Sequence, residues 1–216
     1  LPTREDFDTD GDTRTDLVRL YADGVPTREE IDGDGDGRFE QISLYEAGQI
    51  ARTERDLDGD DAAEDVTEYA DGRPVRRLQD RGGRGQPDRI IHYAPGGDPG
   101  DPLPVRVEED SSGDGRLDTV LFYEAGVHRR SERDGDGDGR PEIWIFNDAN
   151  GQIVRRQEDR HGDGAPDFTV HFRDGVARRV ETRRPGPDGC LEVTSWLDKK
   201  GQVIAEEKDS QDDCQM

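Results

Sequence analysis

The chain is dominated by an acidic nine-residue loop that recurs along its whole length. The clearest copy, 32–40, reads Asp-Gly-Asp-Gly-Asp-Gly-Arg-Phe-Glu and has side-chain oxygens at loop positions 1, 3, 5 and 9. Copies begin at intervals of 24, 24, 24, 30, 24, 25 and 25 residues, at Asp8, Asp32, Asp56, Asp80, Asp110, Asp134, Asp159 and Arg184. Because self-similarity at a period in the twenties is typical of repeat architectures, we expect an array of about eight repeats.

The segment between two loops predicts a β-hairpin. In the second repeat, residues 41–45 alternate polar and apolar side chains, a turn containing Gly48 follows, and 49–55 form a second extended stretch. These are hairpin signals, and no segment keeps a helical period. We therefore predict an all-β fold, a tandem array of about eight 24-residue hairpins that forms an elongated solenoid or meander. A closed β-propeller with two repeats per blade is the alternative.

The chain is interpreted as one repeat domain over residues 1–216. Repeats one to four occupy 1–93, and repeats five to eight with a C-terminal cap occupy 105–216. Between them, the Pro- and Gly-rich segment 94–104 lengthens the fourth hairpin and accounts for the spacing of 30 residues. Such an insertion is tolerated in a surface loop. A recognition loop or a bend between two half-arrays is the functional alternative.

The oxygen-rich loop predicts a site for a hard cation. Calcium takes six to eight oxygens at about 2.3–2.6 Å, and a loop must curl tightly to aim them at one point, which glycines permit. Position 7 would add a backbone carbonyl. In the third loop, Asp61 replaces the position-6 glycine, where we expect strain. The loops that match best predict metal ligands at Asp8, Asp10, Asp12, Arg14, Asp16, Asp32, Asp34, Asp36, Arg38, Glu40, Asp56, Asp58, Asp60, Ala62, Glu64, Asp134, Asp136, Asp138, Arg140 and Glu142.

Two further loops depart from the pattern but keep most of their oxygens. The fifth loop has Ser112 at position 3, and we expect calcium there with reduced affinity. The seventh has His161 at that position. Because imidazole prefers transition metals, the alternatives are a weakened calcium site, an outward-facing histidine or a zinc-selective site. The ligands predicted in these loops are Asp110, Ser112, Asp114, Arg116, Asp118, Asp159, Asp163, Ala165 and Asp167. In total we expect about five to seven Ca²⁺ ions.

The fourth and eighth loops have lost most of their carboxylates. In the fourth, Arg84 stands at position 5, and we expect its guanidinium to bridge Asp80 and Asp88 in place of a metal. The eighth keeps only two acids and is expected to bind none. It carries Cys190, one repeat length before Cys214, and we predict a disulfide between them that staples the C-terminal cap.

Composition points in the same direction. Only 29% of the 216 residues are hydrophobic, 38% are charged, and the formal net charge is −23. A thick two-layer core is therefore not expected, and cations bound only by the folded state would supply stability, about 2.7 kcal/mol per site at 100 times the dissociation constant. The acidic balance disfavours nucleic acid as a partner, because phosphates require basic patches. No apolar run is long enough for a transmembrane segment.

The loop form Asp-x-Asp-x-Asp-Gly-x-x-Asp/Glu, as in Asp32–Glu40, resembles the calcium loops of integrin-type FG-GAP propellers and thrombospondin type 3 repeats. Its first half resembles EF-hand and dockerin loops. The chain is thus similar to bacterial calcium-binding, Asp-rich tandem repeats joined to β-hairpins. It departs from the EF-hand at position 12, where Arg19, Ser43 or Thr67 replaces the bidentate glutamate of that family. The resemblance implies calcium binding.

Together these features favour a non-enzymatic, calcium-stabilised module that acts as a rigid spacer, an adhesin segment or a protein-interaction scaffold. Its partners would be calcium and another protein or a surface glycan. Because loops of modest affinity fill where calcium is near millimolar, we expect an extracellular, cell-surface or periplasmic setting in a bacterium. A calcium buffer or sensor is the main alternative. A propeller-type hydrolase is the remaining one, although no nucleophile signature lies near His92, His128, His161 or His171.

Overall fold

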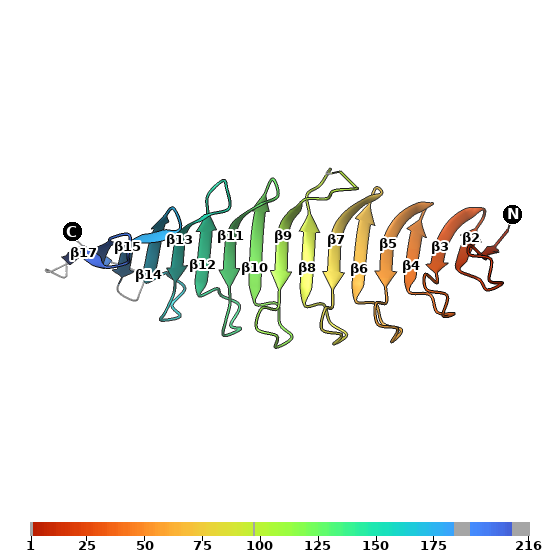
Figure 1. Ribbon diagram of the computed structural model, residues 1–216, viewed down its shortest axis with the longest axis horizontal. Helices are drawn as coiled ribbons and strands as arrows, with labels where there is room; N and C mark the ends of the chain where they lie inside the picture. Colours follow the sequence, from red (N-terminus) through yellow and green to blue (C-terminus); the bar gives the residue numbers. More distant parts are fainter. Residues whose placement is uncertain (1, 97, 184–190, 209–216) are drawn as a thin grey trace. The chain divides into compact units, whose positions relative to one another are not determined.

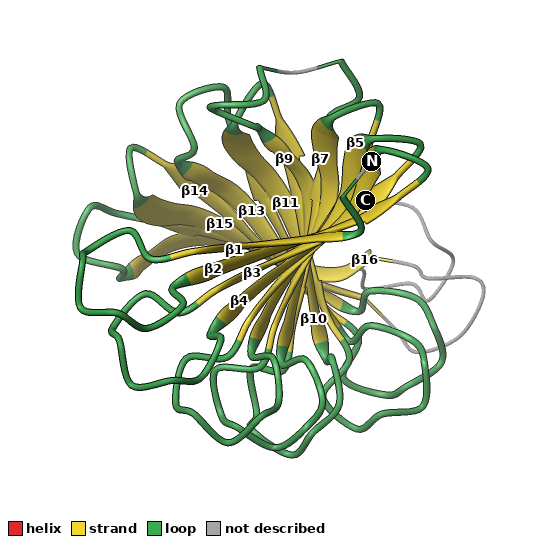
Figure 2. Cartoon of the chain, turned by 90° about the vertical axis from the view of Figure 1, so that its right-hand side faces the viewer, coloured by secondary structure: helices red, strands yellow, loops and turns green. Residues whose placement is uncertain are grey.

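The computed structural model describes residues 2–96, 98–183 and 191–208, and every regular element among them is a β-strand (Figures 1 and 2). The chain divides into two compact parts, Leu1–Val107 and Glu108–Met216, here called unit 1 and unit 2. The division falls within a strand, shortly after the predicted insertion 94–104. The strands that begin in unit 1 are β1 (Arg4–Phe7), β2 (Leu17–Ala22), β3 (Val25–Ile31), β4 (Gln41–Glu46), β5 (Gln49–Arg55), β6 (Asp65–Ala70), β7 (Arg73–Gln79), β8 (Arg89–Tyr93) and β9 (Pro104–Glu109). Those of unit 2 are β10 (Thr119–Glu124), β11 (Val127–Arg133), β12 (Ile143–Asn147), β13 (Ile153–Glu158), β14 (Phe168–Arg173), β15 (Val176–Arg183), β16 (Leu191–Leu197) and β17 (Val203–Lys208).

The strands of each unit form an antiparallel meander. In unit 1, every strand from β1 to β8 pairs with the next one along the chain. In unit 2 the same holds from β10 to β17. Within the described residues, no pairing closes either sheet on itself. The predicted all-β meander of hairpins is confirmed. The propeller alternative is wrong, because a blade of two repeats would end after four strands and these sheets continue.

The hairpins turn through two residues with positive φ. Between β4 and β5 these residues are Ala47, at φ 49°, and Gly48, at φ 79°. Two successive left-handed residues give a tight turn whose twist suits a hairpin. The Asp-Gly pairs at 23–24, 71–72 and 174–175 have similar positive φ values. Turn chemistry visible in the sequence therefore sets the hairpin register.

Each unit is a single twisted layer, so little of it is buried. The strands rotate progressively from one to the next, as the usual strand twist requires, and the turns and acidic loops project outward (Figure 2). Among the described residues, the buried apolar side chains are Val18, Val66, Ile91 and Val107. The thin core expected from the composition is observed, and side-chain pairs along the strands matter correspondingly more.

Arginines on the second strand of each hairpin provide such pairs. Arg28 Nε lies 2.6 Å from Glu30 Oε1 in unit 1, and Arg130 Nη2 lies 2.6 Å from Glu132 Oε1 in unit 2. Arg130 also covers the ring of Phe122, 4.5 Å from its centroid. The two arginine side chains are 37% and 41% exposed. Each ion pair therefore contributes at most about 1 kcal/mol.

Candidate metal centre

Each acidic loop joins the second strand of one hairpin to the first strand of the next. In unit 1 the loops follow β1, β3, β5 and β7, and in unit 2 they precede β10, β12 and β14. Because the strands alternate in direction, the acidic loops of a unit emerge at one edge of its sheet and the hairpin turns at the other (Figure 1). The fold thus lines up the carboxylates of a unit along one edge.

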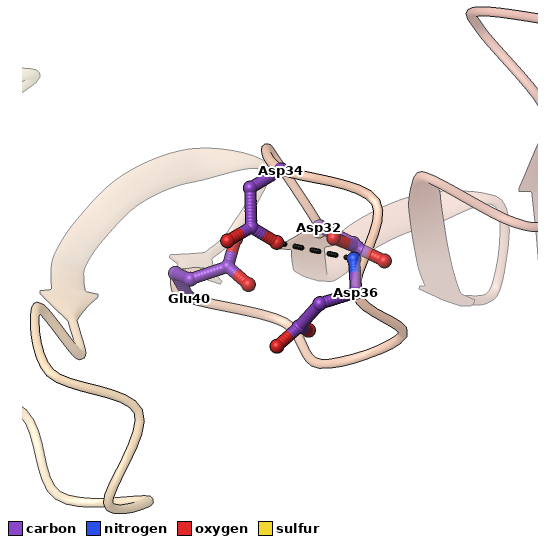
Figure 3. A group of neighbouring side chains, drawn as sticks. All are labelled: Asp32, Asp34, Asp36 and Glu40. Atoms are coloured by element: carbon purple, nitrogen blue, oxygen red, sulfur yellow. Dashed lines mark hydrogen bonds between the residues drawn. The ribbon is translucent and has the colours of Figure 1, made fainter.

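The second loop brings four carboxylates together. Asp32, Asp34, Asp36 and Glu40 each offer an oxygen, and these oxygens lie within 4.8 Å of one another (Figure 3). Asp32 is buried, with 4% exposure, and the other two aspartates are exposed. One carboxylate is therefore held within the fold while the exposed ones remain accessible to a cation.

Asp32 fixes the curl of this loop through both of its oxygens. Its Oδ1 accepts the backbone N–H of Gly35 at 2.8 Å, and its Oδ2 accepts that of Gly37 at 2.9 Å. The two glycines have φ values of 76° and 95°, a region that side chains disfavour. The conformation thus favours glycine at positions 4 and 6.

Backbone amides orient the remaining three carboxylates. Asp34 Oδ1 accepts the N–H of Asp36 at 3.1 Å (dashed in Figure 3), and Asp36 Oδ1 accepts the N–H of Arg38 at 2.8 Å. Glu40 Oε2 accepts the N–H of Gly33 across the loop at 2.7 Å. Each of these carboxylates keeps a second oxygen that these hydrogen bonds do not use.

Three more loops gather carboxylates in the same way. The groups are Asp56, Asp58, Asp60 and Glu64; Asp134, Asp136, Asp138 and Glu142; and Asp8, Asp10 and Asp16. The predicted ligand Asp12 lies outside the last group, and its Oδ1 accepts the N–H of Arg14 at 2.7 Å. Four of the described loops therefore hold three or four carboxylates that could bind a metal ion.

Position 6 accepts a side chain without losing the curl. Asp61 has φ 70°, and its N–H donates to Asp56 Oδ2 at 2.9 Å, as the glycine does in the second loop. The strain expected there is present, because a non-glycine residue occupies the left-handed region. Thr13 is a second case that the sequence analysis missed. It has φ 78° and donates to Asp8 Oδ2 at 2.9 Å.

In the fifth loop, donor groups of the loop itself bond to its carboxylates. Asp118 Oδ1 accepts the hydroxyl of Ser111 at 2.6 Å, and Asp118 Oδ2 accepts the N–H of Ser112 at 2.9 Å. Asp114 Oδ2 pairs with Arg116 Nη2 at 2.8 Å. Asp110, Asp114 and Asp118 are not gathered as closely as the four groups above. They remain predicted ligands, now with competing partners.

The seventh loop uses its histidine in a similar way. His161 Nδ1 lies 2.5 Å from Asp167 Oδ2, which also accepts the N–H of Arg160 at 3.0 Å. Asp159 is buried, with 5% exposure, and accepts the N–H groups of Gly162 and Gly164. The imidazole thus occupies a carboxylate oxygen that a metal would need, and Asp159, Asp163, Ala165 and Asp167 stay predicted ligands only.

The fourth loop holds an internal cation. Arg81, which the sequence analysis did not single out, donates from Nε to Asp88 Oδ1 at 2.7 Å. Asp80 accepts the backbone N–H groups of Arg84, at 3.1 Å, and Gly85, at 2.6 Å. The loop keeps the common curl although it has lost the carboxylates at positions 3 and 5.

Two arginines at position 7, Arg14 and Arg38, link neighbouring loops through their side chains. Arg14 Nη1 donates to the carbonyl oxygen of Gly35 at 2.9 Å, and Arg38 Nη1 donates to that of Gly59. The acceptor is the position-4 residue of the next loop in both cases. The loop pattern predicted only a backbone carbonyl ligand from these arginines. The recurrence of arginine at position 7 is the signal that could have revealed the side-chain contact.

Backbone hydrogen bonds also connect consecutive loops. The N–H of Asp32 donates to the Asp16 carbonyl at 2.8 Å, and the N–H of Asp56 donates to that of Glu40 at 2.9 Å. The same bond from position 1 to the position-9 carbonyl of the preceding loop is made by Asp80, Asp134 and Asp159. Where this bond is made, a single backbone hydrogen bond joins one carboxylate group to the next along the edge of the sheet.

Hydrogen bonding lowers the pKa of two loop aspartates, Asp56 and Asp16. Burial acts to raise the pKa of Asp56, but the N–H groups of Gly59 and Asp61 outweigh it and the pKa is lowered. In the first loop, the hydroxyl and N–H of Thr9 lower the pKa of Asp16. These carboxylates are consequently negative at neutral pH. A set of ionised oxygens with no nitrogen or sulfur donor fits a hard cation such as calcium.

The predicted disulfide between Cys190 and Cys214 lies outside the described residues. No described residue belongs to a helix that is long and apolar enough to cross a membrane.

No protein-family model matches the chain, and no curated protein matches it either. Its likeness to known calcium loops therefore rests on the loop residues described above.

Proposed function

We propose that this chain is a non-enzymatic, calcium-binding repeat module in which Ca²⁺ stabilises the folded array, so that it serves as a rigid spacer, adhesin segment or protein-interaction scaffold outside a bacterial cell. The observation that carries the proposal is the set of four carboxylate groups. Within each group, the oxygens that could bind a metal lie within 4.8 Å of one another. Each group spans the connection between two hairpins. A cation held there would fix one hairpin against the next.

Electrostatics gives the bound cation a structural role. Ionised carboxylates a few ångströms apart repel one another, and this repulsion opposes folding unless a cation lies among them. The chain has a net charge of −23 and few buried apolar side chains to compensate. Calcium bound only by the folded state would add about 2.7 kcal/mol per site at 100 times the dissociation constant.

The partners of the histidines support a non-catalytic role. His128 Nδ1 lies 3.0 Å from the Asn147 amide nitrogen, and His128 Nε2 lies 3.1 Å from the Arg130 carbonyl oxygen. His171 Nε2 lies 3.2 Å from Arg179 Nη2. Both histidine rings thus contact side chains of a neighbouring strand. The carboxylates that lie close enough together to act as a pair belong to the proposed calcium loops.

Calcium titration by calorimetry, combined with thermal unfolding in excess calcium and in chelator, tests the proposal. We expect at least about four equivalents of calcium and a large fall in Tm on chelation, because several sites each contribute through linkage. Magnesium is the matched control, since it demands octahedral geometry and gives up water reluctantly. An unchanged Tm and hydrodynamic radius on chelation would reject the proposal. Sharply cooperative binding near micromolar calcium would instead favour a buffer or sensor.

A further inference from the structure

We propose that the guanidinium group of Arg155, on strand β13 of unit 2, binds a single carboxylate presented by a glutamate side chain of a partner protein. The inference names a partner chemistry for the scaffold part of the proposed function and rests on that part alone. It uses no carboxylate of the acidic loops and therefore does not depend on a bound metal.

An arginine four residues after the turn glycine recurs in the hairpins of both units, and a carboxylate usually accompanies it. In four hairpins this carboxylate belongs to the glutamate two residues later on the same strand, with N–O distances of 2.6–2.8 Å. These pairs are Arg28–Glu30, Arg52–Glu54, Arg130–Glu132 and Arg179–Glu181. Arg76 has Leu78 at that place and pairs with Glu68 on the neighbouring strand instead. An arginine at this position thus holds a carboxylate, whichever strand supplies it.

Arg155 differs, because no carboxylate of a described residue forms an ion pair with it. Its strand has Gln157 two residues later, and the Gln157 amide donates to Thr169 Oγ1 at 3.4 Å. The residues opposite Arg155 on the two neighbouring strands are Phe146 and His171, neither of which carries a negative charge. The Arg155 Nε is buried without an acceptor. The guanidinium is therefore left without the anion that its counterparts hold.

Arg130 shows how a carboxylate can bind to a guanidinium that lies over an aromatic ring. Its Cζ lies 4.5 Å from the centroid of Phe122, while its Nη2 lies 2.6 Å from Glu132 Oε1. The Cζ of Arg155 lies over Phe146 in the same way, 4.0 Å from the ring centroid. Because the N–H donors of a guanidinium lie in its own plane, contact with a ring leaves donors free for a carboxylate. Arg155 thus has the ring of this arrangement and lacks the glutamate.

The charges around Arg155 favour one carboxylate over a multiply charged anion. The strand pairing places Arg130 and Arg179 in the same row of the sheet, each two strands from Arg155, a separation of about 9–10 Å. Both are already paired, with Glu132 and Glu181. A polyanion would therefore meet a carboxylate on either side, whereas a single glutamate meets one cation that is not neutralised. Half-burial of Arg155 reduces the solvent screening of that contact.

The test titrates the full chain in excess calcium with a capped peptide, Gly-Gly-Glu-Gly-Gly, and follows the arginine side-chain N–H signals by NMR. The matched probe has glutamine in place of glutamate, which keeps the shape of the side chain and lacks its charge. We expect one bound equivalent, with a saturable shift at Arg155 and none at Arg130, which already holds its glutamate. Affinity for the glutamine peptide should be lower by at least about ten-fold, the scale of a lost charged hydrogen-bonding pair. Equal affinity for the two peptides would overturn the inference.

Three substitutions make the test specific to Arg155. Gln157→Glu supplies the missing carboxylate from the chain itself, at the place that Glu132 has in its hairpin, and should weaken peptide binding by at least about ten-fold. Gln202→Glu adds the same charge at an exposed residue of the β16–β17 connection and should leave the affinity unchanged. Glu132→Gln frees Arg130 and should add a second bound equivalent. If Gln157→Glu and Gln202→Glu bind the peptide equally, the inference is wrong.

The same samples separate this inference from the proposed calcium function. Gln157→Glu changes no residue of the acidic loops, so calcium titration of the variant and of the unmodified chain is run in parallel with the peptide titrations. Peptide binding without calcium binding would reject the calcium function alone. Calcium binding without peptide binding would reject the Arg155 site alone.

Discussion

The second loop, in unit 1, and the fifth loop, in unit 2, share a backbone conformation but differ in what neutralises their acids. In both, the position-1 aspartate, Asp32 or Asp110, accepts N–H groups from positions 4 and 6. The second loop ends on Glu40, whose carboxylate joins three others within 4.8 Å. The fifth ends on Asp118, whose carboxylate accepts a serine hydroxyl and two backbone amides.

The difference separates two properties that the sequence pattern joins. Aspartate at position 1 and glycine nearby are sufficient for the curl, because the loops share it whether or not they keep their other acids. The need for a cation depends on how many carboxylate oxygens remain after internal donors have bound. By this measure we expect the second loop to depend more than the fifth loop on a bound cation for its charge balance.

The largest expected effect comes from removing one negative charge from the second loop. Asp36→Asn should weaken calcium binding at the second loop and lower the free energy of unfolding by up to about 2.7 kcal/mol at calcium 100 times the dissociation constant. In chelator the same change should be neutral or slightly stabilising, because it removes a like charge. Urea unfolding with calcium and with chelator measures both.

Asp114→Asn is the matched change in the fifth loop. It removes the ion pair with Arg116, which is exposed on both sides, so its effect should be small and the same in both buffers. A calcium-dependent loss of equal size in the two variants would contradict the comparison, because the fifth loop would then need its cation as much as the second loop does.

Acidification in chelator gives an intermediate effect, to which the fifth loop contributes through Asp118. Burial acts to raise the pKa of Asp118, but hydrogen bonds from Ser111, Ser112 and Thr119 outweigh it and lower the pKa to about 2. Since this folded-state pKa lies below the ordinary value of 3.8, the ionised carboxylate stabilises the fold fully above about pH 4. That stabilisation, about 1–2 kcal/mol after solvent screening, is lost as the pH falls toward 2.

Ser111→Ala isolates this contribution. The variant removes the hydroxyl that lies 2.6 Å from Asp118 Oδ1, so the pKa of Asp118 should rise toward its ordinary value and the acid-induced loss between pH 4 and 2 should shrink. NMR titration of the side-chain carboxyl carbon reads the pKa directly, and urea unfolding at each pH reads the stability. A variant curve identical to that of the unmodified chain would contradict the assignment of the low pKa to this hydrogen bond.

The fold was predictable because its determinants are local and periodic. The spacing of the acidic loops gave the repeat, and Asp-Gly at 23–24 marked a turn whose φ values require it. The groups such as Asp32 to Glu40 were predictable for the same reason, since neighbours within nine residues need no tertiary information to meet.

The missed contacts depend on which side chain fills a space between loops. That Arg38 reaches the carbonyl of Gly59 follows from the offset between neighbouring repeats, which the linear sequence does not state. That Ser111 takes an oxygen of Asp118 depends on the rotamer of a small hydroxyl side chain at position 2. Sequence patterns identify the acids of such loops more reliably than they identify their competitors.

The smallest expected effect concerns the curl itself. Thr13 stands at position 6 of the first loop with φ 78°, where Gly37 stands in the second loop with φ 95°. Thr13→Gly should therefore stabilise the chain by about 0.5–1 kcal/mol, because relief of a β-branched residue from the left-handed region exceeds the entropy that glycine loses on folding. The gain should be equal in calcium and in chelator, since no carboxylate changes. Gly37→Thr, the reverse exchange, should destabilise by a similar amount, and a gain for Thr13→Gly only in calcium would show that position 6 acts on the cation rather than on the curl.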